Sequence, residues 1–127
     1  MPKFGNTSKG RLNTCHPYLQ LILNKVIQTY DCTILCGFRA ELGQNTAFEA
    51  GKSMLAWPES KHNNMLGYKP YSLAIDVGPW PLDWDDIDEF KHLGGRILQA
   101  ADCLGIPLVW GGNWTTFKDY PHYQLIL

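Results

Sequence analysis

The segment Tyr71–Pro79 reads YSLAIDVGP and gives the clearest strand signal in the chain. Every second residue is apolar and falls on one face of the expected strand, namely Leu73, Ile75 and Val77. The opposite face carries the acidic residue Asp76 beside the small residue Ala74. Because aspartate is depleted in strands, we expect this face to serve a purpose that needs a carboxylate with open space around it.

Further elements are expected on both sides of this strand. Apolar spacing predicts helices over residues 14–30, 39–51 and 86–104, the last with Asp86 and Glu89 as a capping box. Strands are expected over residues 32–37, 107–110 and 122–127. Helices and hairpin-type strands segregate rather than alternate as βαβ units. The predicted class is therefore α+β, with helices packed against a small antiparallel sheet of about four strands.

Size and charge exclude several kinds of protein. With 127 residues, the chain is expected to form one domain over residues 1–127, long enough to bury a core. A content of 45% hydrophobic and 18% charged residues is ordinary for a globular protein. A net charge of -1 argues against binding that depends on a basic field over nucleic acid or anionic lipid. We expect no nucleic-acid partner and no membrane insertion.

The cysteines indicate a reduced protein. No two of them form a CxxC pair, and Cys32 and Cys36 share an expected strand, where about 13 Å would separate their Cα atoms. A disulfide spans at most about 7 Å, so buried free thiols and synthesis in the cytoplasm are expected. The N-terminal residues contain no apolar segment of the kind found in secretory signals.

Two histidines can combine with the strand aspartate. His62 lies in a polar loop before the Asp76 strand, and His122 opens the last strand. A single histidine is more often structural than a metal ligand. We interpret the other two in this way: His16 lies at the start of a helix, and His92 follows Asp88 by one helical turn. Together, two imidazoles and one carboxylate match a catalytic zinc shell whose fourth position is left for water. Asp119 lies close to His122 in the sequence and need not bind the metal.

Four ordered motifs extend this pattern to a family resemblance. They are SKH at 60–62, LAIDV at 73–77, WGGNW at 110–114 and DYPHYQ at 119–124. The set resembles the zinc peptidases that include D-alanyl-D-alanine carboxypeptidases, vancomycin-resistance (VanY-like) peptidases and phage L-alanyl-D-glutamate endolysins. GFRAELGQNTAFEAGKS at 37–53 is similar to the GYRS…Q…AxG segment of that family, with Arg39 and Gln44 in matching places. The resemblance runs from about His16 to the end of the chain.

The resemblance implies a fold and a role for each matching residue. It implies a hedgehog/D-Ala-D-Ala peptidase-like fold, a bound Zn²⁺ and an acid-base carboxylate at Asp119. Arg39 would stabilise the oxyanion, although an arginine that begins a surface helix explains it equally well. The remaining implied roles are metal binding by His62, Asp76 and His122, and substrate binding or support of the ligands by Ser60, Gln44 and Trp110.

One departure from the family concerns loop length. The family has a compact SxHxxGxAxD block, whereas NNMLGYKPYSL separates His62 from Ala74 here. The inserted residues are expected to alter the rim of the cleft.

The resemblance also implies a substrate and a place of action. A small domain without a signal looks most like a phage endolysin that cuts the L-Ala-D-Glu bond of the bacterial peptidoglycan stem peptide. It would be made in the host cytoplasm, released through a separate pore, and by default a monomer. The alternatives are a D-Ala-D-Ala carboxypeptidase or dipeptidase with the same metal chemistry, and a non-hydrolytic, zinc-containing binding module. Asp119 favours a hydrolase over the module.

Overall fold

The computed structural model describes residues 2–127 and confirms the α+β class. The helices are α1 (Asn6–Leu12), α2 (Pro17–Ile27), α3 (Glu41–Glu49) and α4 (Ile87–Leu104), with 3₁₀ turns η1 (Lys61–Asn63) and η2 (Gly111–Asn113). The strands are β1 (Cys32–Cys36), β2 (Met65–Leu66), β3 (Lys69–Pro70), β4 (Ala74–Pro79), β5 (Leu108–Trp110) and β6 (His122–Leu125). Four of these strands form an antiparallel sheet, as the sequence predicts, and their order is β1-β4-β6-β5.

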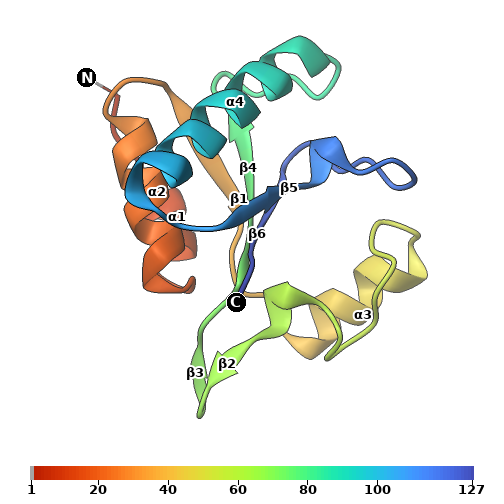
Figure 1. Ribbon diagram of the computed structural model, residues 1–127. Helices are drawn as coiled ribbons and strands as arrows, with labels where there is room; N and C mark the ends of the chain where they lie inside the picture. Colours follow the sequence, from red (N-terminus) through yellow and green to blue (C-terminus); the bar gives the residue numbers. More distant parts are fainter. Residues whose placement is uncertain (1) are drawn as a thin grey trace.

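The two faces of the sheet meet different surroundings (Figure 1). Helices α1, α2 and α4 pack on one face, whereas α3 and η1 lie on the other side. The apolar residues of β4 and β6, Ile75, Val77, Tyr123 and Leu125, are at most 1% exposed in the helix-covered core. Burying each such side chain contributes about 1.5–3 kcal/mol. This burial fixes the register of both strands, so Asp76 and His122 must point to the opposite face.

The long helix α4 begins and ends where the sequence predicts. The side chain of Asp86 accepts a hydrogen bond from the backbone N–H of Glu89 at 3.2 Å and caps the first turn. Apolar residues at helical spacing are buried along its inner side, namely Phe90, Leu93, Ile97 and Ala101. The strong period of this stripe explains why the prediction was accurate.

The prediction of a helix over residues 14–30 was three residues too long at each end. Helix α2 begins at Pro17, and the Nδ1 atom of His16 caps it by accepting a hydrogen bond from the N–H of Tyr18 at 2.9 Å. The backbone of Cys15 instead forms an isolated parallel β-bridge with that of Ser72. A proline fits the first turn of a helix, which marks the true boundary.

Two elements have no apolar period and were not predicted. Helix α1 is held to the edge strand β1 by polar contacts: the Oγ of Ser8 accepts from the N–H of Ile34 at 3.1 Å, and Arg11 donates to the carbonyl of Ile34 at 2.9 Å. The inserted residues after His62 form the hairpin of β2 and β3, which projects away from the body of the fold (Figure 1).

All four cysteines are free thiols, and Cys15 and Cys32 are buried as expected. The expectation of burial was wrong for Cys103, which is exposed, and for Cys36, which is partly exposed. Cys103 lies one residue from the end of α4, where the apolar stripe faces away from it. None of the helices in residues 2–127 is both long and apolar enough to cross a membrane.

Candidate active site

The structure brings His62, Asp76 and His122 together from three parts of the chain. Asp76 and His122 are register partners on β4 and β6, and Asp76 Oδ1 lies 3.2 Å from His122 Nδ1. His62 arrives from η1, with its Nε2 at 3.2 Å from the same oxygen and at 3.3 Å from His122 Nδ1. Three potential ligand atoms thus form a nearly equilateral triangle.

Hydrogen bonds on the far side of each ring orient both imidazoles. The Nδ1–H of His62 donates to the carbonyl of Gly37 at 2.8 Å, and the Nε2–H of His122 donates to Oε1 of Gln124 at 2.8 Å. Each ring therefore presents its other nitrogen to Asp76 Oδ1. Histidines that bind metals generally use one nitrogen for the metal and the other for such a hydrogen bond.

This triangle fits a divalent cation. Tetrahedral zinc with bonds of about 2.0–2.1 Å to nitrogen and oxygen separates its ligand atoms by roughly 3.3 Å. The ligand atoms of His62, Asp76 and His122 have this spacing, and two imidazoles with a carboxylate are a common donor set for a catalytic zinc ion. Without a cation, two nitrogen lone pairs would face each other at 3.3 Å, which is unfavourable.

The charges around Asp76 favour a buried carboxylate. Burial favours its neutral acid, but His62 and His122 outweigh burial and hold the pKa of Asp76 far below its ordinary value. Burial likewise disfavours a charged His62, yet the carboxylate of Asp76 raises the pKa of His62 to about 10. In the absence of a metal, a proton on His62 therefore takes the place of the cation.

Arg39 lies beside the second oxygen of Asp76. Its Nη2 is 3.4 Å from Asp76 Oδ2, and its Nη1 donates to Oε1 of Gln44 at 3.1 Å. Gln44 is fully buried and also accepts from Nδ2 of Asn63 at 3.1 Å. Asn63 in turn donates to the backbone carbonyl of Arg39 at 2.9 Å. This network fixes the guanidinium at the edge of the triangle.

The turn before β6 places Asp119 next to the same three residues. Its backbone carbonyl accepts from the N–H of His122 at 3.1 Å, and its N–H donates to the carbonyl of Gly111 at 3.1 Å. A Cβ atom on Gly111 would lie 2.4 Å from that Asp119 carbonyl, so only glycine allows the close approach. The turn explains why Asp119 precedes His122 by three positions in the sequence.

The carboxylate of Asp119 is available for chemistry. Within residues 2–127 its side chain forms no hydrogen bond or ion pair, and it lines the same cavity as the triangle. Burial, followed by the negative charge of Asp76, raises the pKa of Asp119 above its ordinary value. A carboxyl group with a raised pKa can both accept and return a proton near neutral pH.

The cavity around these groups has a volume of about 750 Å³. One wall is the segment 52–61 that follows α3, and the other is the segment 114–119 before β6. Trp84 and Trp114 add aromatic surface, and the ring of Trp114 lies 5.2 Å from that of His122. The inserted β2–β3 hairpin contributes no lining residue. The cavity is large enough for a short peptide segment.

The other two residues implied by the resemblance lie at different depths. Ser60 lines the cavity, and its Oγ accepts from the backbone N–H of His62 at 3.2 Å, which fixes the start of η1. Trp110 is in the core, where its indole N–H donates to the carbonyl of Tyr120 at 2.7 Å. Its ring packs so closely on Gly112 that a Cβ there would lie 2.3 Å from it. Trp110 thus supports the turn behind Asp119 and does not line the cavity.

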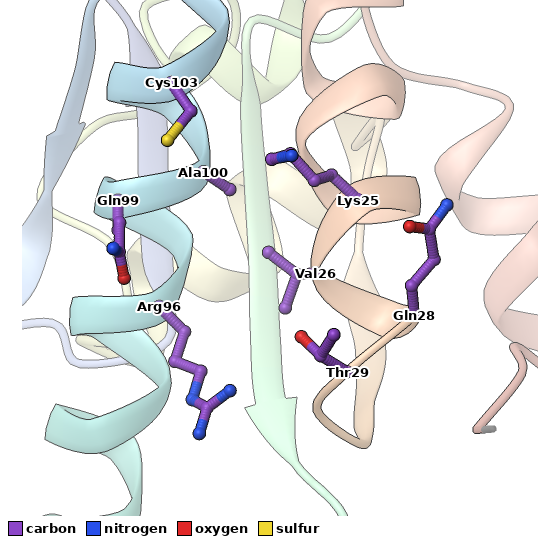
Figure 2. Close-up of a pocket in the computed structure, with 8 residues that line it drawn as sticks. All are labelled: Lys25, Val26, Gln28, Thr29, Arg96, Gln99, Ala100 and Cys103. Carbon is purple, nitrogen blue, oxygen red and sulfur yellow. The ribbon is translucent and has the colours of Figure 1, made fainter.

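A second hollow lies between α2 and α4, on the other side of the sheet (Figure 2). It is smaller, about 220 Å³, and is lined by basic and neutral residues such as Lys25, Arg96 and Gln99. It carries no carboxylate and no imidazole. The first cavity is therefore the candidate active site.

Gln124 is a site residue that the sequence did not reveal. Its signal was its place two residues after His122 on the same strand face.

Gln124→Leu removes the acceptor that orients His122, so we expect metal affinity to fall about 10- to 100-fold while the fold is retained. Competition with a chromogenic chelator measures this loss. Gln99→Leu, an exposed change on α4, is the control, and equal affinities in both variants would contradict the role of Gln124.

Comparisons with known proteins point to one kind of enzyme. A family model described as phage L-alanyl-D-glutamate peptidase matches residues 1–124. The L-alanyl-D-glutamate peptidase of Escherichia phage T5 is 35% identical over 125 residues, covering 93% of this chain and 85% of that protein. The peptidoglycan L-alanyl-D-glutamate endopeptidase CwlK of Bacillus subtilis (strain 168) is 29% identical over 104 residues, 76% of this chain and 61% of the relative.

A solved structure agrees with these sequence relatives. The crystal structure of the Serratia marcescens L-Ala D-Glu endopeptidase ChiX matches with a TM-score of 0.81 and 26% identity. The match covers 98% of this chain and 90% of that one.

Proposed function

The chain belongs to the phage L-alanyl-D-glutamate peptidase family, and on this premise we propose that it is a peptidoglycan hydrolase that cuts the bond between L-alanine and D-glutamate in the stem peptide. The observation that carries the proposal is the triangle of His62, Asp76 and His122 with Asp119 in the same cavity. We take residues 1–127 as one catalytic domain.

The proposed cofactor is Zn²⁺, held by His62 Nε2, Asp76 Oδ1 and His122 Nδ1. A bound zinc ion supplies a Lewis acid that polarises the scissile carbonyl and makes water a stronger nucleophile at neutral pH. The Gly37 carbonyl and the Gln124 side chain keep both imidazoles in the tautomer that this role needs.

Asp119 is the proposed acid-base residue. Its carboxylate takes a proton from the water that attacks the carbonyl carbon of L-alanine. It then returns this proton to the departing amine nitrogen of D-glutamate as the C–N bond breaks. The raised pKa of Asp119 suits both steps, because the proton is neither lost too readily nor held too tightly.

Arg39 is the proposed stabiliser of the developing oxyanion. Its guanidinium is held by Gln44 and by Asp76 before the substrate arrives, so no reorganisation is needed as negative charge develops on the carbonyl oxygen. Such a fixed donor contributes to the transition state more than to the ground state.

The products of wall digestion test the proposed bond. Purified bacterial cell walls treated with the zinc-loaded protein are expected to lose turbidity and to yield fragments with a new free amine on D-glutamate. Mass analysis of the soluble fragments identifies the cut. Release of D-alanine instead would assign the protein to the D,D-carboxypeptidases, and intact walls would favour a binding module.

We further infer that the cell wall is the place of action and that a separate pore gives access to it. The phage origin of the T5 relative supports this inference. The protein is taken to act as a monomer.

A further inference from the structure

We propose that Lys52 binds the free carboxylate of the substrate's D-glutamate residue and thereby selects stem peptides in which this group is charged. The inference rests on the proposed function. Glutamate has two carboxyl groups and a peptide continues through only one of them, so the other remains beside the scissile bond. With an ordinary pKa of about 4.3, it is ionised at neutral pH.

An anionic substrate meets a cavity that already contains carboxylates. Asp76, Asp119 and Glu59 all line it. Moving another carboxylate out of water and next to these groups is costly unless a cation pairs with it. The site therefore needs a cation that is not already engaged within the protein.

Besides the two histidines of the triangle, one arginine and two lysines line the cavity, and two of these three cations are engaged. Arg39 contacts both Asp76 and Gln44. The ammonium group of Lys61 donates to the carbonyl of Leu125 at 2.6 Å. Lys52 remains: within residues 2–127 its side chain forms no hydrogen bond and no ion pair, not even with Glu59 on the same wall.

The backbone of Lys52 is fixed although its side chain is exposed. Helix α3 ends at Glu49, and two residues later Gly51 reverses the chain with a φ of 75°, a conformation that glycine readily adopts. The N–H groups of Lys52 and Ser53 then both donate to the carbonyl of Ala47, at 2.9 and 3.1 Å. The ammonium group therefore extends on a flexible four-carbon stem from a fixed point on the wall.

Gln44 links this wall directly to the catalytic groups. Its Nε2 donates to Oγ of Ser53 at 2.9 Å, while its Oε1 accepts from Nη1 of Arg39 at 3.1 Å. The carboxamide of Gln44 thus holds Ser53, the residue after Lys52, with its nitrogen and the guanidinium of Arg39 with its oxygen. Lys52 therefore lines the same cavity as Arg39, Asp76 and Asp119, on a wall that is tied to the guanidinium.

Two synthetic stem peptides test the inference. They differ only in the unused carboxyl of D-glutamate, which is free in one and amidated in the other. The zinc-loaded wild-type protein is expected to show a kcat/KM about tenfold higher for the free carboxylate, mainly through KM, as one charge-assisted hydrogen bond would give. Lys52→Gln should bring the ratio of the two kcat/KM values close to one, and Lys52→Arg should restore it.

Lys69→Gln is the matched control, because Lys69 lies on the β2–β3 hairpin, away from the cavity, and should keep the wild-type ratio. The inference is overturned if Lys52→Gln keeps the wild-type ratio, or if the wild-type protein cuts both peptides equally well. If the wild-type protein cuts neither peptide between L-alanine and D-glutamate, the proposed function itself fails and the inference fails with it.

Discussion

Asp119→Asn is expected to lower the rate of wall hydrolysis about 10²- to 10⁴-fold, the usual contribution of a general acid-base residue. The substitution keeps the size of the side chain and leaves the triangle of His62, Asp76 and His122 intact, so metal content and thermal stability should stay near wild type. Turbidity loss of purified walls measures the rate, and elemental analysis measures the metal.

Glu59→Gln is the control for this experiment. Glu59 is a second carboxylate of the same cavity wall, and it is exposed and outside the triangle. Its loss should change the rate by less than about tenfold. If Asp119→Asn hydrolysed walls at the wild-type rate, the acid-base assignment would be wrong.

The pH dependence of kcat/KM tests the acid-base role of Asp119 independently. Burial and the charge of Asp76 raise its pKa. The residue must be ionised to accept a proton, so activity is lost as the pH falls through this raised value. With zinc kept saturating at every pH, we expect the acidic limb of kcat/KM in the wild-type enzyme to lie above the range of an ordinary aspartate, and this limb to be absent from the residual activity of Asp119→Asn.

His122→Ala is expected to abolish both metal binding and hydrolysis. The substitution removes one of three protein ligands and leaves His62 Nε2 and Asp76 Oδ1 as an incomplete site. It also removes the ring on which Trp114 packs, so some loss of stability should accompany it. His92→Ala, an exposed change on α4, is the control and should keep metal and activity.

Metal affinity should rise with pH in the wild-type protein. Without metal, His62 has a pKa of about 10 and carries a proton at neutral pH. Zinc must displace this proton, so each unit of pH gained below that value should strengthen binding by about tenfold. Titration with zinc at pH 6, 7 and 8 in the presence of a competing chelator measures the slope, and a flat profile would contradict the proton exchange.

The elements with a strong apolar period could be predicted from the sequence. The stripe of α4 and the alternation of β4 and β6 depend on burial in the core, which leaves a regular trace in the chain. The same alternation places Asp76 and His122 on the opposite face. His62 could not be placed by periodicity: it was grouped with Asp76 and His122 because two imidazoles and a carboxylate match a zinc shell, and the family resemblance supported this grouping.

Contacts between polar groups that are distant in the chain left no such trace. Helix α1 reads NTSKGRL and depends on Ser8 and Arg11 meeting the edge of β1. The role of Gln44 depends on Arg39, Ser53 and Asn63 converging on one buried carboxamide. These contacts are properties of the folded arrangement and have no period in the sequence.

Elemental analysis of the purified protein tests the central claim most directly. If His62, Asp76 and His122 form a catalytic metal site, the active protein contains one zinc per chain, and single alanine substitutions of these residues contain none and do not degrade walls. A metal-free protein that cuts the L-Ala-D-Glu bond at full rate would contradict this account.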